Sequence, residues 1–255
     1  MKKYILNKYT MFILGTIFFF LVWWLISLIV DNQSMIVPSP INTFIETGNV
    51  LTQSYTYLCV LYSLLRMILG FIIALILALV LSFIVYNNEH LYNFFTPSMT
   101  ILKVIPTAAV IFLFVVVNGS SFAPVMVVAL ISFPILYEAI ANGLRNTNKD
   151  ILNASQMDGA TKVASLFKVR VPLALPYMII GIITSFSLSF KIEIMAEVIT
   201  GSTKDGIGCL IKGAQINNPT DMTQVFAYSL IAIVLMLIVS FVSMIIRKKL
   251  ELKVD

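Results

Sequence analysis

Long, uninterrupted apolar runs dominate the chain, and short polar segments separate them. A helix needs roughly 20 residues to cross the hydrocarbon core of a bilayer, and the runs have about that length. Lipid offers the backbone no hydrogen-bond partners, so such runs form helices or a closed barrel, and their continuous rather than alternating pattern excludes the barrel. We therefore predict an all-α polytopic membrane protein. Its six transmembrane helices are expected near residues 11–30, 64–86, 98–117, 122–141, 173–199 and 224–246.

Composition supports a membrane protein and excludes a soluble one. The 255 residues are 59% hydrophobic and only 11% charged, and the mean hydropathy is +0.97. Soluble domains carry about 25% charged residues. The first run follows lysines, as a signal peptide does, but it is too long for one and lacks a small-x-small cleavage site, so we expect a retained span. The prediction is a single transmembrane domain over residues 1–255.

The distribution of Lys and Arg predicts the orientation. Twelve of them lie before the first run, between the fourth and fifth, or after the sixth, and only two lie on the other side. By the positive-inside rule, both termini and the loop 142–171 are expected in the cytoplasm of a prokaryotic cell. The net charge of +5 is explained by this topology and requires no nucleic acid. The residues are Lys2, Lys3, Lys8, Arg145, Lys149, Lys162, Lys168, Arg170, Arg247, Lys248, Lys249 and Lys253 on one side, against Lys204 and Lys212.

The loop 142–171 contains two short helices by its pattern. Residues 147–150 have the form of a capping box that opens the first helix. That helix is expected to end at Gly159, since glycine tolerates the left-handed turn that terminates helices. Small Ala154 and Ser155 on it would let another protein surface approach closely. In the second helix Val163, Leu166 and Phe167 share one face, and Pro172 begins the fifth span, where its missing N–H is harmless.

The spacing of this loop resembles the EAA loop of the membrane subunits of ABC importers. That motif is Glu-Ala-Ala, three residues, Gly, nine residues, and Ile-x-Leu-Pro. The chain has Asn153-Ala154-Ser155, then Gly159, then 169–172 with the sequence Val-Arg-Val-Pro. The spacing matches throughout. Asn153 replaces the usual Glu, which removes a carboxylate from the docking surface.

Four other segments resemble the nitrate/sulfonate/taurine-type permeases: 37–44, 63–71, 102–109 and 195–201. The resemblance implies a permease that forms the path for a small solute delivered by an extracytoplasmic binding protein. It implies two permeases, identical or homologous, two cytoplasmic ATPase subunits that bind ATP and Mg, and a coupling helix between spans four and five. The ATPase-coupling residues would be Asn153, Ala154, Ser155, Gly159, Leu166, Phe167 and Pro172.

Several charges fall inside the predicted spans, where each costs about 2.5–3.5 kcal/mol at the membrane centre. For Arg66 and Lys103 we favour placement at the interfaces. Glu193 and Glu197 are one turn apart and share a face, whereas Lys191 is offset by about 200° from Glu193. This group is either a polar wall of the translocation path or a set of salt bridges between spans. The candidate path residues are Lys191, Glu193, Glu197, Lys103 and Pro106.

The motifs argue against catalysis by this chain. His90 is the only histidine, so neither a metal site nor histidine-based catalysis is expected, and residues 201–208 have the wrong spacing for a phosphate-binding loop. The alternatives are an ion-coupled secondary transporter, which would show inverted repeats, and a membrane-embedded enzyme, which would need a cluster of carboxylates or histidines. Nitrate, sulfonates, taurine and vitamin precursors all suit the resemblance as solutes.

Overall fold

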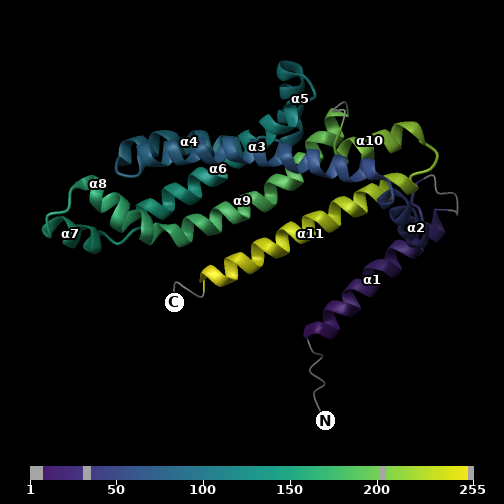
Figure 1. The fold of residues 1–255 in the computed structure, drawn as a ribbon, viewed down its shortest axis with the longest axis horizontal. Coiled ribbons are helices and arrows are strands. Elements are labelled where there is room, and N and C mark those ends of the chain that lie inside the picture. The colour runs from purple at the N-terminus through teal and green to yellow at the C-terminus, as the bar shows by residue number, and fades with distance from the viewer. Residues whose placement is uncertain (1–7, 31–35, 202–204, 252–255) are drawn as a thin grey trace, which may run out of the picture.

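The computed structural model describes residues 8–30, 36–201 and 205–251, and every regular element in these ranges is a helix (Figure 1). Lys2, Lys3, Lys204 and Lys253 of the charge pattern lie outside the described residues. The elements are α1 (Lys8–Ile29), α2 (Pro40–Leu51), α3 (Ser54–Val85), α4 (Glu89–Val104), α5 (Thr107–Asn118), α6 (Ala123–Arg145), α7 (Lys149–Met157), α8 (Lys162–Ser165), the π-helix η1 (Leu166–Arg170), α9 (Val171–Thr200), α10 (Ile207–Asn217) and α11 (Thr223–Glu251).

Five helical stretches in the described residues are long and apolar enough to cross a membrane. They are Thr10–Ile29, Ser54–Val85, Ala123–Arg145, Lys162–Thr200 and Thr223–Lys248. Each contains or largely overlaps one of the predicted runs, so the all-helical membrane architecture is confirmed. The remaining predicted span, the third in chain order at 98–117, corresponds to α4 and α5, which meet at an angle of 94°.

The third predicted span, over 98–117, is therefore broken into two helices. The break lies at Ile105 and Pro106, whose ψ angles of 129° and 122° are extended rather than helical. A proline disfavours the helical conformation of the residue before it and has no N–H to continue the hydrogen-bond ladder. Pro134, by contrast, lies inside α6, which continues through it.

The helix α6 is the centre of the bundle and packs extensively against α3 and α9. In its most apolar stretch 61% of the residues are buried, against 6% in α1. Glycines on α3 and α9 permit the close approach of these helices to α6. A Cβ on Gly70 of α3 would lie 2.6 Å from the carbonyl oxygen of Val125, and one on Gly181 of α9 would overlap the side chain of Ala139. Small residues at helix contacts are the usual means of packing spans in lipid.

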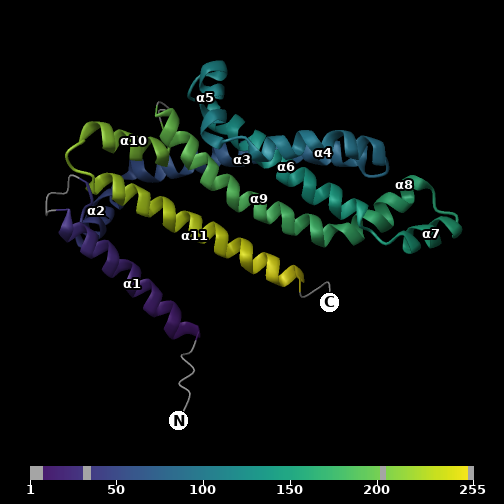
Figure 2. The same cartoon turned by 180° about the vertical axis from the view of Figure 1, so that it is seen from behind.

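The bundle is elongated and has two distinct ends, which both views show (Figures 1 and 2). We call one the α7 end, with α7, α8 and the turn 86–88 between α3 and α4, and the other the α2 end, with α2 and α10. The helix α1 diverges from the bundle and contacts it near the C-terminal end of α1. There the Trp23 indole N–H donates to the carbonyl of Pro38 at 3.2 Å, and its ring stacks on Phe226 with centroids 6.0 Å apart.

The helix that follows α7 is continuous with the fifth span, a feature that the sequence did not reveal. The stretch Lys162–Thr200 is one helical rod with a π turn at Leu166–Arg170. In that turn the Val171 N–H donates to the carbonyl of Leu166, five residues back. An α-helix would place the ring of Pro172 against the carbonyl four residues earlier, and the wider π turn relieves this clash. Pro172 thus marks the start of α9 without separating it from the loop.

Candidate functional site

The helix α7 begins at an asparagine cap. The Asn148 Oδ1 accepts a hydrogen bond from the Asp150 N–H at 2.8 Å, which satisfies a backbone donor that the first turn leaves free. The capping box that the sequence predicted was led by Thr147. In the structure Thr147 is buried, and its hydroxyl donates to the carbonyl of Leu144 at 3.2 Å, in the last turn of α6. The cap therefore falls one residue later than expected.

The C-terminal end of α7 has the glycine-terminated form that the sequence predicted. Gly159 has φ +84°, and the Ala160 N–H donates to the carbonyl of Ser155 at 3.1 Å. These features define a Schellman turn, in which a left-handed residue lets the chain reverse. A Cβ on Gly159 would meet nothing within 4 Å. The requirement for glycine is therefore conformational and does not come from lack of space.

The helix α7 turns one face to the bundle and one to the outside. Leu152 is 6% exposed and packs inward. Asn153 and Ala154 are exposed, Ser155 is half-buried, and Met157 is exposed. The views of the whole chain place α7 at the extreme end of the bundle (Figures 1 and 2). The motif residues thus form a small, polar outer surface at the tip of the molecule.

The second part of the loop has a different character. Phe167 and Val163 are exposed, and Leu166 is partly buried. The Phe167 ring lies 6.3 Å from the ring of Phe83 on α3. The spacing predicted one shared face for these three apolar residues, and two of them are exposed in the structure.

Glu197 is the centre of a polar cluster near the α2 end. Its carboxylate is 0% exposed and forms an ion pair with Arg66 at 2.9 Å. The hydroxyl of Ser63 lies 2.9 and 2.8 Å from the two carboxylate oxygens, and the Gly208 N–H donates to one of them at 2.9 Å. Arg66 also donates to the carbonyl of Asp205. The cluster joins α3, α9 and the start of α10.

The contacts of Arg66 were not predicted by the sequence analysis, which favoured a place at the outer interface. Its side chain is only 17% exposed because the buried carboxylate of Glu197 draws it inward. Ser63 and Gly208 were not singled out at all. A serine or glycine among apolar residues carries no signal of its own, and only the fold brings these two to the carboxylate. A Cβ on Gly208 would collide with the Cβ of Glu197, so the close approach requires glycine there.

Glu193 lies one turn before Glu197 on the same face of α9, as the spacing predicted. It is 0% exposed, and neither carboxylate oxygen has a hydrogen-bond partner among the described residues. Lys191 is exposed on a different side of the helix. The structure therefore brings the two glutamates together and leaves Lys191 apart from them. An unpartnered buried polar group is costly, and each instance calls for an explanation.

Lys103 forms an ion pair that the sequence analysis missed. Its ammonium lies 2.7 Å from the carboxylate of Glu138 on α6. Both side chains are partly exposed, at 34% and 50%. Glu138 falls inside the apolar run 122–141, and a carboxylate within a span was the available signal. The pair links α6 to the end of α4, just before the break at Pro106.

The chain matches the family described as the inner membrane component of binding-protein-dependent transport systems, over residues 70–255. It belongs to this family. The matched part runs from the middle of α3 to the end of the chain and includes the loop with α7 and the Glu197 carboxylate. The protein is thus the permease subunit of an ABC importer, as the resemblance indicated.

Similar permeases support this assignment, and solved structures share the fold. The chain is 25% identical over 232 residues to a putative aliphatic sulfonates transport permease of Bacillus subtilis, covering 90% of this chain and 83% of the relative. It is 25% identical over 223 residues to a formylaminopyrimidine transport permease of Halalkalibacterium halodurans, covering 86% and 88%. The fold is similar to that of an amino acid ABC transporter, with a TM-score of 0.66 at 15% identity, covering 79% of this chain and 97% of that one. It is also similar to the inward-facing MetNI methionine ABC transporter, with a TM-score of 0.61 at 18% identity, covering 74% and 93%.

Family membership decides between the alternatives left by the sequence. An ABC permease subunit is neither an ion-coupled secondary transporter nor an enzyme, and ATP binds to the separate ATPase subunit. Permeases of this family are the membrane component of the importer and function together with ATPase subunits and binding proteins. The described residues include no group of three or more His, Cys, Asp or Glu side chains that could hold a metal ion.

Proposed function

We propose that α7 is the coupling helix of this ABC importer permease. The observation that carries the proposal is a capped, nine-residue polar helix at the tip of the bundle, between two spanning helices. Its outward face consists of Asn153, Ala154 and Ser155, and its inner face is fixed by Leu152. Small side chains allow the closest approach of a partner surface. Force applied to α7 would reach α9 through α8 and η1, which contact α7 and form one rod with α9.

The proposed topology has six crossings, with α4 and α5 together as the third. The Lys and Arg asymmetry supports cytoplasmic termini and a cytoplasmic α7, with α2 and α10 outside. Two copies of the chain, or this chain and a homologue, would form the path, and two ATPase subunits would dock at the α7 ends. Leu166, Phe167 and Pro172 would transmit the movement of α7 rather than contact the ATPase, since Pro172 lies at the start of α9.

For the buried charges we propose two different roles. The hydrogen bonds around Glu197 support a structural clamp that holds α3, α9 and α10 together. Glu193 has no such partners, which supports a place beside the translocation path that opens when the helices move. Lys191, Lys103 and Pro106 remain candidates for the same path, with the break at Pro106 as a hinge.

For the solute we propose a small organic molecule delivered by an extracytoplasmic binding protein. The full-length similarity to permeases named for aliphatic sulfonates and formylaminopyrimidine supports a sulfonate or a vitamin precursor. Stabilisation of the associated binding protein against heat by an alkanesulfonate or by a formylaminopyrimidine would distinguish the two classes.

Substitutions at one position of α7 test the coupling proposal. Ala154→Asp adds a charge and bulk to the outer surface, whereas Ala154→Ser keeps the surface small. In the reconstituted importer, we expect Ala154→Asp to lose uptake and ATPase co-purification, and Ala154→Ser to retain both. Both variants should insert into the membrane normally, since Ala154 is exposed. Normal uptake and unchanged ATPase binding by Ala154→Asp would show that α7 is an ordinary loop helix.

A further inference from the structure

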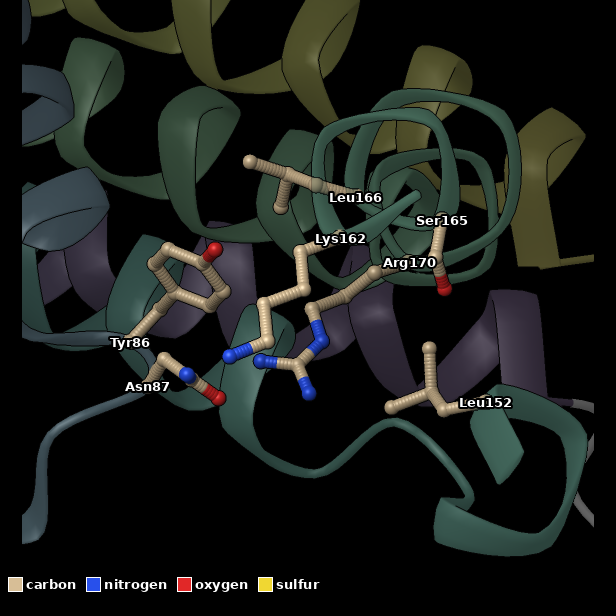
Figure 3. Close-up of a pocket in the computed structure, with 7 residues that line it drawn as sticks. All are labelled: Tyr86, Asn87, Leu152, Lys162, Ser165, Leu166 and Arg170. Atoms are coloured by element: carbon tan, nitrogen blue, oxygen red, sulfur yellow. The ribbon is translucent and has the colours of Figure 1, made fainter. Parts of the chain in front are cut away.

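A small cavity lies at the α7 end, between the end of α3 and the helical rod that leads into α9. Its volume is about 60 Å³, and one bound water occupies about 10–15 Å³ on this scale, so a group of several heavy atoms fits. Three elements and a turn contribute to it, which makes it a composite site (Figure 3). The lining residues are Tyr86, Asn87, Leu152, Lys162, Ser165, Leu166 and Arg170.

Two cationic side chains converge in this cavity. Figure 3 shows the ammonium of Lys162 and the guanidinium of Arg170 pointing toward the same region, beside Tyr86 and Asn87. The Arg170 guanidinium lies 4.9 Å from the centre of the Tyr86 ring. Neither cation forms an ion pair with a carboxylate of the described residues, and no acidic residue lines the cavity. Two like charges held together repel each other, and an anion between them removes the repulsion.

Ser165 provides an independent observation. The residue is 3% exposed, and its hydroxyl has no hydrogen-bond partner among the described residues. It lines the cavity on the side of Leu152 and Arg170 (Figure 3). A buried hydroxyl without a partner costs free energy, so a ligand that accepts its hydrogen bond would remove that cost. Together with the amide of Asn87, the site offers two cations and neutral donors.

We propose that this cavity binds a phosphate group, namely that of an anionic phospholipid at the membrane interface. Phosphate oxygens match a guanidinium and an ammonium with additional hydroxyl and amide donors. Because α3 ends at Val85 and the fifth span begins beside the cavity, we expect the cavity at the depth of the lipid headgroups. Exposed Phe167 and Val163 on the same rod suit contact with acyl chains. The inference concerns neither the transported solute nor the ATPase, so it stands apart from the proposed coupling.

The test uses the full-length importer in nanodiscs of phosphatidylcholine, with or without phosphatidylglycerol. Native mass spectrometry measures the phosphatidylglycerol retained after extraction, for the wild type, Lys162→Gln, Arg170→Gln and Arg170→Lys. The matched control is Lys168→Gln, which removes an exposed lysine from the same rod but outside the cavity. Each lost cation should lower phosphatidylglycerol retention about fivefold, while the control should not. Arg170→Lys should restore part of the retention.

Inorganic phosphate, titrated into the nanodiscs that contain only phosphatidylcholine, distinguishes the two sources of the group. No effect of phosphate on thermal stability, together with specific lipid retention, assigns the site to the phospholipid. Stabilisation of the wild type but not of Lys162→Gln by phosphate would support a phosphate site filled from solution. Equal retention by all variants, without stabilisation by phosphate, overturns the proposal. So does a loss of ATPase co-purification by Lys162→Gln with lipid retention unchanged, which would assign the cations to an acidic partner surface.

Discussion

The two buried glutamates of α9 should respond very differently to the same neutral substitution. The carboxylate of Glu197 accepts hydrogen bonds from Arg66, Ser63 and the Gly208 N–H. In Glu197→Gln the amide NH₂ replaces one acceptor, so at least one of these donors faces another donor. Breaking a buried ion pair by removing one partner costs about 3–5 kcal/mol. Glu193 accepts no hydrogen bond from the described residues, so Glu193→Gln should change stability by less than about 1 kcal/mol.

Thermal unfolding in detergent measures the contrast. For a chain of this length, 1 kcal/mol corresponds to about 2–4 °C in the melting temperature. We therefore expect Glu197→Gln to lower it by about 6–20 °C and Glu193→Gln by at most about 4 °C. A double-mutant cycle with Arg66→Gln isolates the ion pair, because residues in contact show interaction energies of about 0.5–3 kcal/mol.

Two results would refute this reasoning. Equal loss of stability in both glutamine variants would show that Glu193 has partners that matter as much as those of Glu197. Additive effects of Arg66→Gln and Glu197→Gln would show that the ion pair contributes nothing. Uptake supplies a second readout. A stable Glu193→Gln importer that no longer transports would support the place of Glu193 beside the path, whereas wild-type transport would exclude it.

Three further predictions concern the loop, the helix packing and the topology. Gly159→Val should destabilise the turn after α7 by about 1–2 kcal/mol, because φ at this position is +84°. Binding-protein-stimulated ATP hydrolysis should therefore fall in Gly159→Val, whereas Gly159→Asn should retain most of it. Equal hydrolysis by both variants would refute the role of the turn. Gly181→Val should lower the melting temperature by several degrees, because the new side chain would overlap Ala139. Gly48→Ala should not, because the space around Gly48 is open. Similar melting temperatures of the two variants would contradict the close packing of α9 on α6. A cysteine at position 149, in a background without other cysteines, should react with an impermeant maleimide only after the membrane is opened, and labelling in intact cells would invert the topology.

Local patterns of the sequence were sufficient to predict five of the spanning helices and the glycine turn that ends α7. In lipid, the backbone of a long apolar run can satisfy its hydrogen bonds only within a helix. The helices α3, α6 and α11 could therefore be predicted from their apolar runs alone. Gly159 could be assigned a left-handed conformation because few other residues tolerate it. The family resemblance likewise rests on short-range spacing, which survives the replacement of Glu by Asn153.

Tertiary structure alone decided what the charged residues contact and how the helices join. Glu197 lies more than 130 positions from both Ser63 and Arg66 in the chain. Only the packing of α3 on α9 brings these residues together. Lys103 and Glu138, 35 positions apart, are likewise brought together only by the packing of α4 on α6. Periodicity predicts which residues share a face of one helix, but it does not state which helix covers that face. The sequence also did not predict the π turn at Leu166–Arg170 or the 94° angle of the break at Pro106. A proline indicates that the regular hydrogen-bond ladder is interrupted, and the neighbouring helices determine whether the chain widens, bends or breaks there.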